Sequence, residues 1–139
     1  MGSISFLFWG GYMKRKIIIA CVSVLAVFVL LIAGLVGWFI YADNYQLSDR
    51  GRSSSPDGRY EVVFHQVGSP QWPFGSVDVR ATLRIKESKK KIEVIETSIS
   101  NDGVPFYEQD WSVVWQDESV EITLRGSEQE DAVYLVPLQ

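Results

Sequence analysis

The stretch "VDVRATLRI", Val77 to Ile85, alternates apolar and polar side chains without interruption. The apolar members are Val77, Val79, Ala81, Leu83 and Ile85. Strict alternation is typical of a β-strand that has one buried face and one face in water. The stretch therefore predicts an antiparallel strand, and its flanking segments indicate what kind of sheet it joins.

The flanking segments also have the pattern of short strands. We expect further strands at Tyr60 to Val67, Ile92 to Ile99, Trp111 to Trp115, Val120 to Leu124 and Val133 to Leu138. Turn residues separate them, as in Pro56-Asp57-Gly58 and Asn101-Asp102-Gly103. In the strand from Ile92 the apolar phase changes at Ile95, which predicts a β-bulge or a strand buried on both faces. The sequence thus predicts an all-β domain, a small antiparallel meander that closes into a barrel or sandwich.

Upstream of this domain, residues 17–42 contain no charged side chain and are mostly Ile, Val, Leu, Phe, Ala and Gly. About 20 apolar residues are enough for a helix to cross the hydrocarbon core of a bilayer. We therefore expect one transmembrane α-helix and a bilayer contact through residues 17–42. The alternative is a cleaved signal peptide, whose apolar core is shorter, about 7–15 residues, and whose cleavage site would be Ile40-Tyr41-Ala42.

The charges beside the apolar run predict its orientation. Lys14, Arg15 and Lys16 precede the run, and Asp43 follows it. By the positive-inside rule the N-terminus lies in the cytoplasm, and the β domain lies outside the cell membrane. The expected organisation is a cytoplasmic segment at 1–16, the helix at 17–42, a polar Ser- and Gly-rich stalk at 43–58 and the β domain at 59–139.

Composition argues against several function classes. From Asp43 onward the chain has ten Lys and Arg against 17 Asp and Glu, a net charge of −7, which disfavours nucleic acid as a partner. Cys21 is the only cysteine and His65 the only histidine, so the usual transition-metal ligand sets are missing. No nucleophile, base and orienting group can be assigned together. We therefore expect neither an enzyme nor a cofactor.

The candidate binding loop is "GSPQWPFGS", which places Trp72 and Phe74 between Gly and Pro residues. Two interpretations remain open at this stage. The loop either folds back as a plug that closes the core with its aromatic side chains, or holds them outward as anchors for a partner.

The candidate acidic surface is Glu128, Glu130 and Asp131 in "GSEQED". Their oxygen atoms are possible Ca²⁺ ligands, but their spacing does not match the register of an EF-hand. A solvated turn is the other interpretation.

Parts of the chain resemble known families. "SPDGRY", Ser55 to Tyr60, and "VVWQDESVEITL", Val113 to Leu124, resemble strand segments of TolB-like β-propeller blades, although the chain is too short for a propeller. A larger part of the chain, residues 14–138 with "WPFGS" and "SNDG", loosely resembles small single-pass membrane proteins of Gram-positive bacteria that carry an SPDG-initiated β domain. This resemblance implies a location in the cell envelope and assigns no functional residue.

Together these features predict a non-enzymatic module that binds another envelope or secreted protein. The alternative is an accessory or sensory subunit of a membrane complex that acts through its helix, where Gly34 and Gly37 permit close helix approach.

Overall fold

A computed structural model describes residues Ile4–Gln139, which divide into a helical unit up to Ile40 and a β unit from Tyr41. The helix α1 spans Ile4–Asn44, and its part Gly10–Asn44 is long and apolar enough to cross a membrane. The helix therefore extends past both ends of the apolar run at 17–42. Its most apolar window has no residue buried against the rest of the chain, as expected of a helix that faces lipid on all sides.

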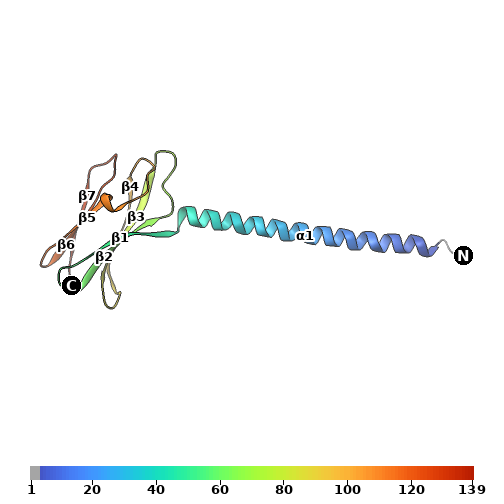
Figure 1. The fold of residues 1–139 in the computed structure, drawn as a ribbon, viewed down its shortest axis with the longest axis horizontal. Coiled ribbons are helices and arrows are strands. Elements are labelled where there is room, and N and C mark those ends of the chain that lie inside the picture. Colours follow the sequence, from blue (N-terminus) through green and yellow to red (C-terminus); the bar gives the residue numbers. More distant parts are fainter. Residues whose placement is uncertain (1–3) are drawn as a thin grey trace. The chain divides into compact units, whose positions relative to one another are not determined.

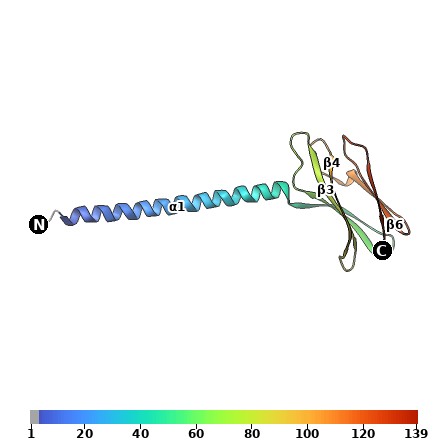
Figure 2. The same cartoon turned by 180° about the vertical axis from the view of Figure 1, so that it is seen from behind.

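The β unit contains two antiparallel sheets (Figures 1 and 2). The first sheet has the order β1 (Leu47–Ser54), β2 (Tyr60–Val67), β3 (Ser76–Ile85) and β4 (Lys91–Ser100), and the second has the order β5 (Trp111–Trp115), β6 (Ser119–Leu124) and β7 (Ala132–Pro137). A short 3₁₀ helix, Glu108–Asp110, precedes β5. Every strand pairs with its sequence neighbour within its sheet, so the prediction of an all-β meander after one apolar helix is confirmed.

The core lies between the inner faces of the two sheets. In β3 Val77, Val79, Ala81 and Leu83 are buried and Ile85 is half-buried, so the apolar face packs into the core as expected, and Thr82 on the other face is also buried. The buried side chains from the first sheet include Val62, Phe64, Val79 and Leu83, and those from the second include Val120, Ile122 and Leu124. Phe106, in the connection between the sheets, is fully buried in the same cluster.

Half of the segment expected to be a stalk is part of the sheet. Leu47–Ser54 forms β1 and pairs with β2 along its length, so the interpretation of 43–58 as a flexible linker is wrong for these residues. The strand has the polar sequence "LSDRGRSS" and lies at the edge of its sheet, with a register shift between Asp49 and Gly51. Main-chain hydrogen bonds are enough to hold such a strand in the sheet, even though it has no apolar face. For that reason its side-chain pattern does not predict a strand.

The predicted bulge is present in β4. Leu83 pairs with Glu93 and Arg84 pairs with Lys91, so Ile92 has no direct partner across the ladder. An extra residue in one strand reverses the alternation of side chains beyond it. The bulge therefore explains the apolar phase change in this strand.

Tryptophan side chains join the two sheets on the side where β1 faces β5. The indole N–H of Trp115 donates to Ser53 Oγ at 3.0 Å, and that of Trp111 donates to the Arg50 carbonyl oxygen at 3.4 Å. The Trp111 ring also stacks on Phe64 with a centroid separation of 4.2 Å. One side of the sandwich is thus closed by indole contacts.

Candidate functional site

The loop between β2 and β3 presents Trp72 and Phe74 to the solvent. Trp72 is 91% exposed and Phe74 is 73% exposed, so the plug interpretation is wrong. The core is covered instead by Phe106, which is 0% exposed and whose N–H donates to Gln66 Oε1 at 3.0 Å. Because Phe106 already covers the core at this end, the loop aromatics remain outside.

Main-chain hydrogen bonds hold the loop in shape. The Gln71 N–H donates to the Ser76 carbonyl at 2.9 Å, and the Gly75 N–H donates to the Gln71 carbonyl at 2.8 Å. The Gly103 N–H donates to the Gly75 carbonyl at 2.8 Å, and a Cβ at Gly103 would lie 2.4 Å from the Pro73 carbonyl oxygen. The Asn101–Gly103 turn therefore supports the loop, and the aromatic side chains stand on a fixed backbone.

The acidic residues Glu128, Glu130 and Asp131 lie in the loop between β6 and β7. Asp131 pairs with Arg125 at 3.3 Å. The Glu128 N–H donates to the Ser100 carbonyl at 3.2 Å, so here the backbone and not the carboxylate makes the contact. Within Ile4–Gln139, no group of three or more His, Cys, Asp or Glu side chains is placed to hold a metal ion.

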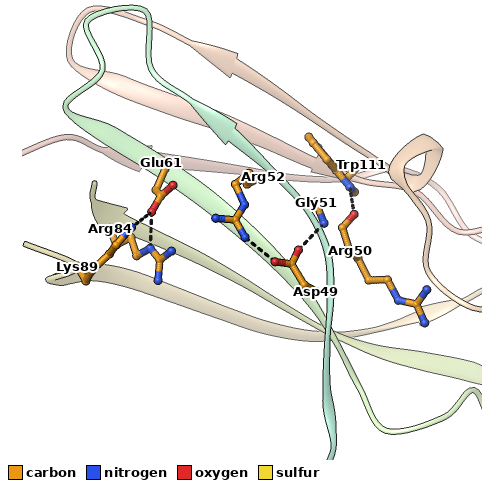
Figure 3. A network of polar contacts seen from close by, with 8 residues as sticks. All are labelled: Asp49, Arg50, Gly51, Arg52, Glu61, Arg84, Lys89 and Trp111. Carbon is orange, nitrogen blue, oxygen red and sulfur yellow. Dashed lines mark hydrogen bonds and ion pairs between the residues drawn. The ribbon is translucent and has the colours of Figure 1, made fainter. Parts of the chain in front are cut away.

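A polar network lies on the first sheet (Figure 3). Glu61 is only 2% exposed, and its Oε1 accepts from Arg84 Nε at 2.8 Å and from Lys89 Nζ at 3.1 Å. Burial raises the pKa of the Glu61 carboxyl, but the hydrogen bonds from Lys89 and Arg84 outweigh burial and leave its pKa below the usual value. Arg84 and Lys89 thus both bind the Glu61 carboxylate, and this contact joins β2 to β3 and to the β3–β4 turn.

His65 lies half-buried in β2, paired across the sheet with Asp49 on one side and Arg80 on the other. Burial lowers the pKa of its imidazole, although the nearby Asp49 carboxylate acts in the opposite direction. In the described part of the chain, its Nδ1 is buried and has no hydrogen-bond partner. The side chain is therefore neutral at pH 7.

A hollow of about 640 Å³ lies where the β1–β2 turn, the β5–β6 turn and residues 137–139 meet. Two of the polar side chains that line it, Ser55 and Asp57, make hydrogen bonds within the β1–β2 turn. The Asp57 carboxylate accepts from the Ser55 hydroxyl at 2.6 Å and from the Arg59 N–H at 3.0 Å. These bonds hold the pKa of Asp57 below its usual value, as is typical of a structural turn aspartate.

The edge of the second sheet carries the feature that the sequence did not reveal. β7 is an edge strand, and its Val133 and Leu135 side chains are 57% and 64% exposed. A groove of about 370 Å³ separates this strand from the β4 edge, where Glu93 and Ile95 line it. Unlike the β1–β5 side, where indole groups bridge the sheets, the β4–β7 side is open.

The main chain of β7 presents free donors to this groove. The Leu138 N–H donates to the Glu118 carbonyl at 2.8 Å, and from there the antiparallel pairs alternate along the ladder. The N–H groups of Tyr134 and Val136 consequently point toward β6, and those of Val133 and Leu135 point outward. Pro137, which has no N–H, occupies an outward position of the same parity, where proline interrupts no ladder bond.

A signal for this edge exists in the sequence. From Val133 to Leu138 every residue is apolar or aromatic, so the strand has no polar face for solvent. That pattern was compatible with a strand buried on both faces, and only the sheet order shows that one face and one edge are open.

No family model, curated protein or solved structure matches the chain. The geometry of the loop and of the open edge therefore carries the functional argument.

Proposed function

We propose that this chain is a single-pass membrane protein, with its N-terminus in the cytoplasm, whose β domain outside the cell membrane binds an extended segment of another envelope or secreted protein. It acts as a non-enzymatic interaction module. The observation that carries this proposal is the open β7 edge, with outward N–H groups and exposed apolar side chains beside a groove.

An exposed strand edge is a template for pairing with another strand, and soluble domains normally protect such edges with charges or covering segments. β4 follows that rule, because Lys91, Glu93 and Glu96 are exposed along it. β7 does not, because Val133 and Leu135 are the most exposed side chains in its central part. A partner strand added to β7 would satisfy the outward N–H groups and cover both apolar side chains.

The charge of this half of the domain defines the chemistry of the partner. From Asn101 onward, nine Asp and Glu stand against Arg125 alone. Glu93 lines the groove, and Glu121 lies across the ladder from Leu135. The complementary partner is an extended segment in which apolar residues alternate with Lys or Arg, because opposite charges steer association and set register.

The membrane location is supported by the apolar helix Gly10–Asn44, by the three basic residues 14–16 that precede its uncharged run and by Asp43, which follows it. In this arrangement the partner site lies outside, on a domain tied to the bilayer by one helix.

The test is photo-crosslinking of the full-length protein in native membranes, with a photoreactive residue in place of Leu135. The matched control is Val114, which is 52% exposed on β5 and lies across the ladder from the same Glu121, on the same face of the sheet but on the strand at the other side of β6. We expect one discrete protein adduct from position 135 and none from position 114. With the purified partner, amide exchange at Val133 and Leu135 should slow. Equal adducts at both positions, or none at 135, contradict the edge as the partner site.

A second variant separates the module from an accessory subunit that acts through its helix. Residues 17–42 are replaced by an unrelated apolar helix of equal length. If the adduct at position 135 persists, the β domain carries the interaction. If it disappears while the protein remains in the membrane, the helix carries it, and Gly34 and Gly37 become the residues to examine.

A further inference from the structure

The Trp72 loop begins at the end of the apolar helix. The Ser69 N–H donates to the Asp43 carbonyl at 2.6 Å, and the Gly68 N–H donates to the Gln46 carbonyl at 2.8 Å. Gly68 has φ +67°, and a Cβ there would lie 2.4 Å from the Asp43 carbonyl oxygen, so a glycine is needed for this approach. Asp43 is the first charged residue after the uncharged run, so the start of the loop contacts the end of the segment expected to cross the bilayer.

The loop is long enough to reach the lipid headgroups. Each leaflet has an interfacial layer of roughly 5–8 Å outside the hydrocarbon core. Trp72 follows Ser69 by three residues, and three extended residues span at most about 11 Å. The Trp72 indole therefore reaches the headgroup layer when the loop runs toward the membrane from its contact with Asp43.

The side chains at this end suit the bilayer interface. No charged residue occurs from Gly68 to Gly75, and Trp72 and Phe74 are the most exposed aromatic side chains of the β unit. Tyr45, Leu47 and Val104 are also exposed apolar side chains of the β unit. Tryptophan is enriched at membrane–water interfaces because its ring is apolar while its N–H can bond to headgroups or water.

The turns at the opposite end of the strands differ. The β3–β4 turn contains Lys86, Glu87, Lys89 and Lys90, and the β5–β6 turn contains Asp117 and Glu118. Charged turns are suited to water. At the other end the Trp72 loop is uncharged, although the neighbouring β4–β5 and β6–β7 connections carry Asp102, Glu128, Glu130 and Asp131, so the apolar character belongs to this loop and not to the whole end.

From these observations we propose that Trp72 and Phe74 insert into the headgroup layer of the membrane that holds α1, giving the β domain a second contact with the bilayer beside its helix. This inference rests on the proposed membrane anchoring. The bilayer is favoured over a protein ligand for this loop because the chain tethers the loop to the segment expected to cross the bilayer, which raises the effective concentration of the interface, whereas a separate partner must be recruited.

The experiment uses the full-length protein in nanodiscs of equal parts phosphatidylcholine and phosphatidylglycerol. A photoreactive residue replaces Trp72, Leu135 or Leu30 in three separate preparations. Leu30 lies within the apolar helix and tests the membrane anchor itself, and Leu135 is an exposed control on β7. We expect lipid adducts at positions 30 and 72 and none at 135. The adduct at 72 should be unchanged by added salt, because the loop has no charge.

A second measurement uses the variant Trp72→Phe, which keeps an aromatic side chain in the loop. Lipids brominated near the headgroup should quench the tryptophan fluorescence of the wild type more strongly than that of Trp72→Phe. If lipid adducts form at position 30 but not at 72, the inference is overturned and the anchor stands. If none forms at position 30, the anchor and the inference both fail. A protein adduct at 72 in native membranes, without lipid adduct, overturns the inference and makes the loop a recognition surface.

Discussion

Gly51 of β1 lies directly against the indole of Trp111 in β5, so that a Cβ built on Gly51 would come within 2.7 Å of Trp111 Cζ2. This contact brings the edge of one sheet onto the other at the β1 bulge, where Gly51 has φ +130°. The Trp111 ring also stacks on Phe64, which holds it from a second direction. The ring therefore has little room to move away, and the position requires glycine.

Replacing Gly51 with alanine should destabilise the β domain by about 2–4 kcal/mol, because a strained φ and a steric overlap with Trp111 act together. The measurement is urea unfolding of the full-length protein in mild detergent, followed by tryptophan fluorescence. The matched control is Gly58→Ala. Gly58 also has a positive φ, +73°, but no atom lies within 4 Å of its Cβ position. Equal losses in the two variants would contradict the role of the Trp111 contact.

The hydrogen bond from the Trp115 indole to Ser53 should contribute about 1 kcal/mol to stability. Ser53→Ala leaves the part-buried indole N–H without its acceptor, and we expect the midpoint of urea unfolding to fall. In a Trp115→Phe background the same substitution should have almost no effect, because the donor is already gone. A double-mutant cycle with no coupling between the two positions would show that this bond does not join the sheets.

Glu61 should make the domain sensitive to acid at low pH. Its pKa is lowered from the ordinary value of 4.5, so in the acid range the folded state binds fewer protons than the unfolded state. The stabilisation is complete above pH 4.5 and is lost as the pH falls from 4.5 through the folded-state pKa.

The variant Glu61→Gln should lower the free energy of unfolding at pH 7 by roughly 1–3 kcal/mol. It should also make the free energy of unfolding less dependent on pH below 4.5. The control is Glu96→Gln. Glu96 also pairs with an arginine, Arg80, at 2.6 Å, but its side chain is 62% exposed, and exposed pairs contribute roughly 0–1 kcal/mol. Similar losses in both variants would mean that burial of Glu61 does not strengthen its pairing.

His65 should titrate below its ordinary pKa of 6.5, because burial disfavours the imidazolium. Between 6.5 and the folded-state pKa the unfolded chain binds more protons, so the free energy of unfolding decreases as the pH falls through this window. NMR titration of the imidazole in the full-length protein measures the midpoint. Asp49→Asn should lower that midpoint further, since the Asp49 carboxylate raises it. A midpoint at or above 6.5 would contradict this account.

The uncharged run at 17–42 and the alternation from Val77 to Ile85 determined the apolar helix and the all-β class on their own. Both are local patterns, because the length of an apolar run and a period of two in the side chains can be read without knowing which segments meet. The phase change at Ile95 predicted the β4 bulge for the same reason.

Only the tertiary structure decided β1, the exposure of Trp72 and Phe74, and the open edge at β7. β1 exists because the edge of β2 offers main-chain partners to a polar segment, which no side-chain pattern records. The loop aromatics are exposed because Phe106, about 30 residues away in the chain, already covers the core. β7 is apolar on both faces, and whether its outer face is covered depends on the order of strands in the sheet. Each of these outcomes depends on a competition between distant segments for the same space, and that competition is resolved only when the chain has folded.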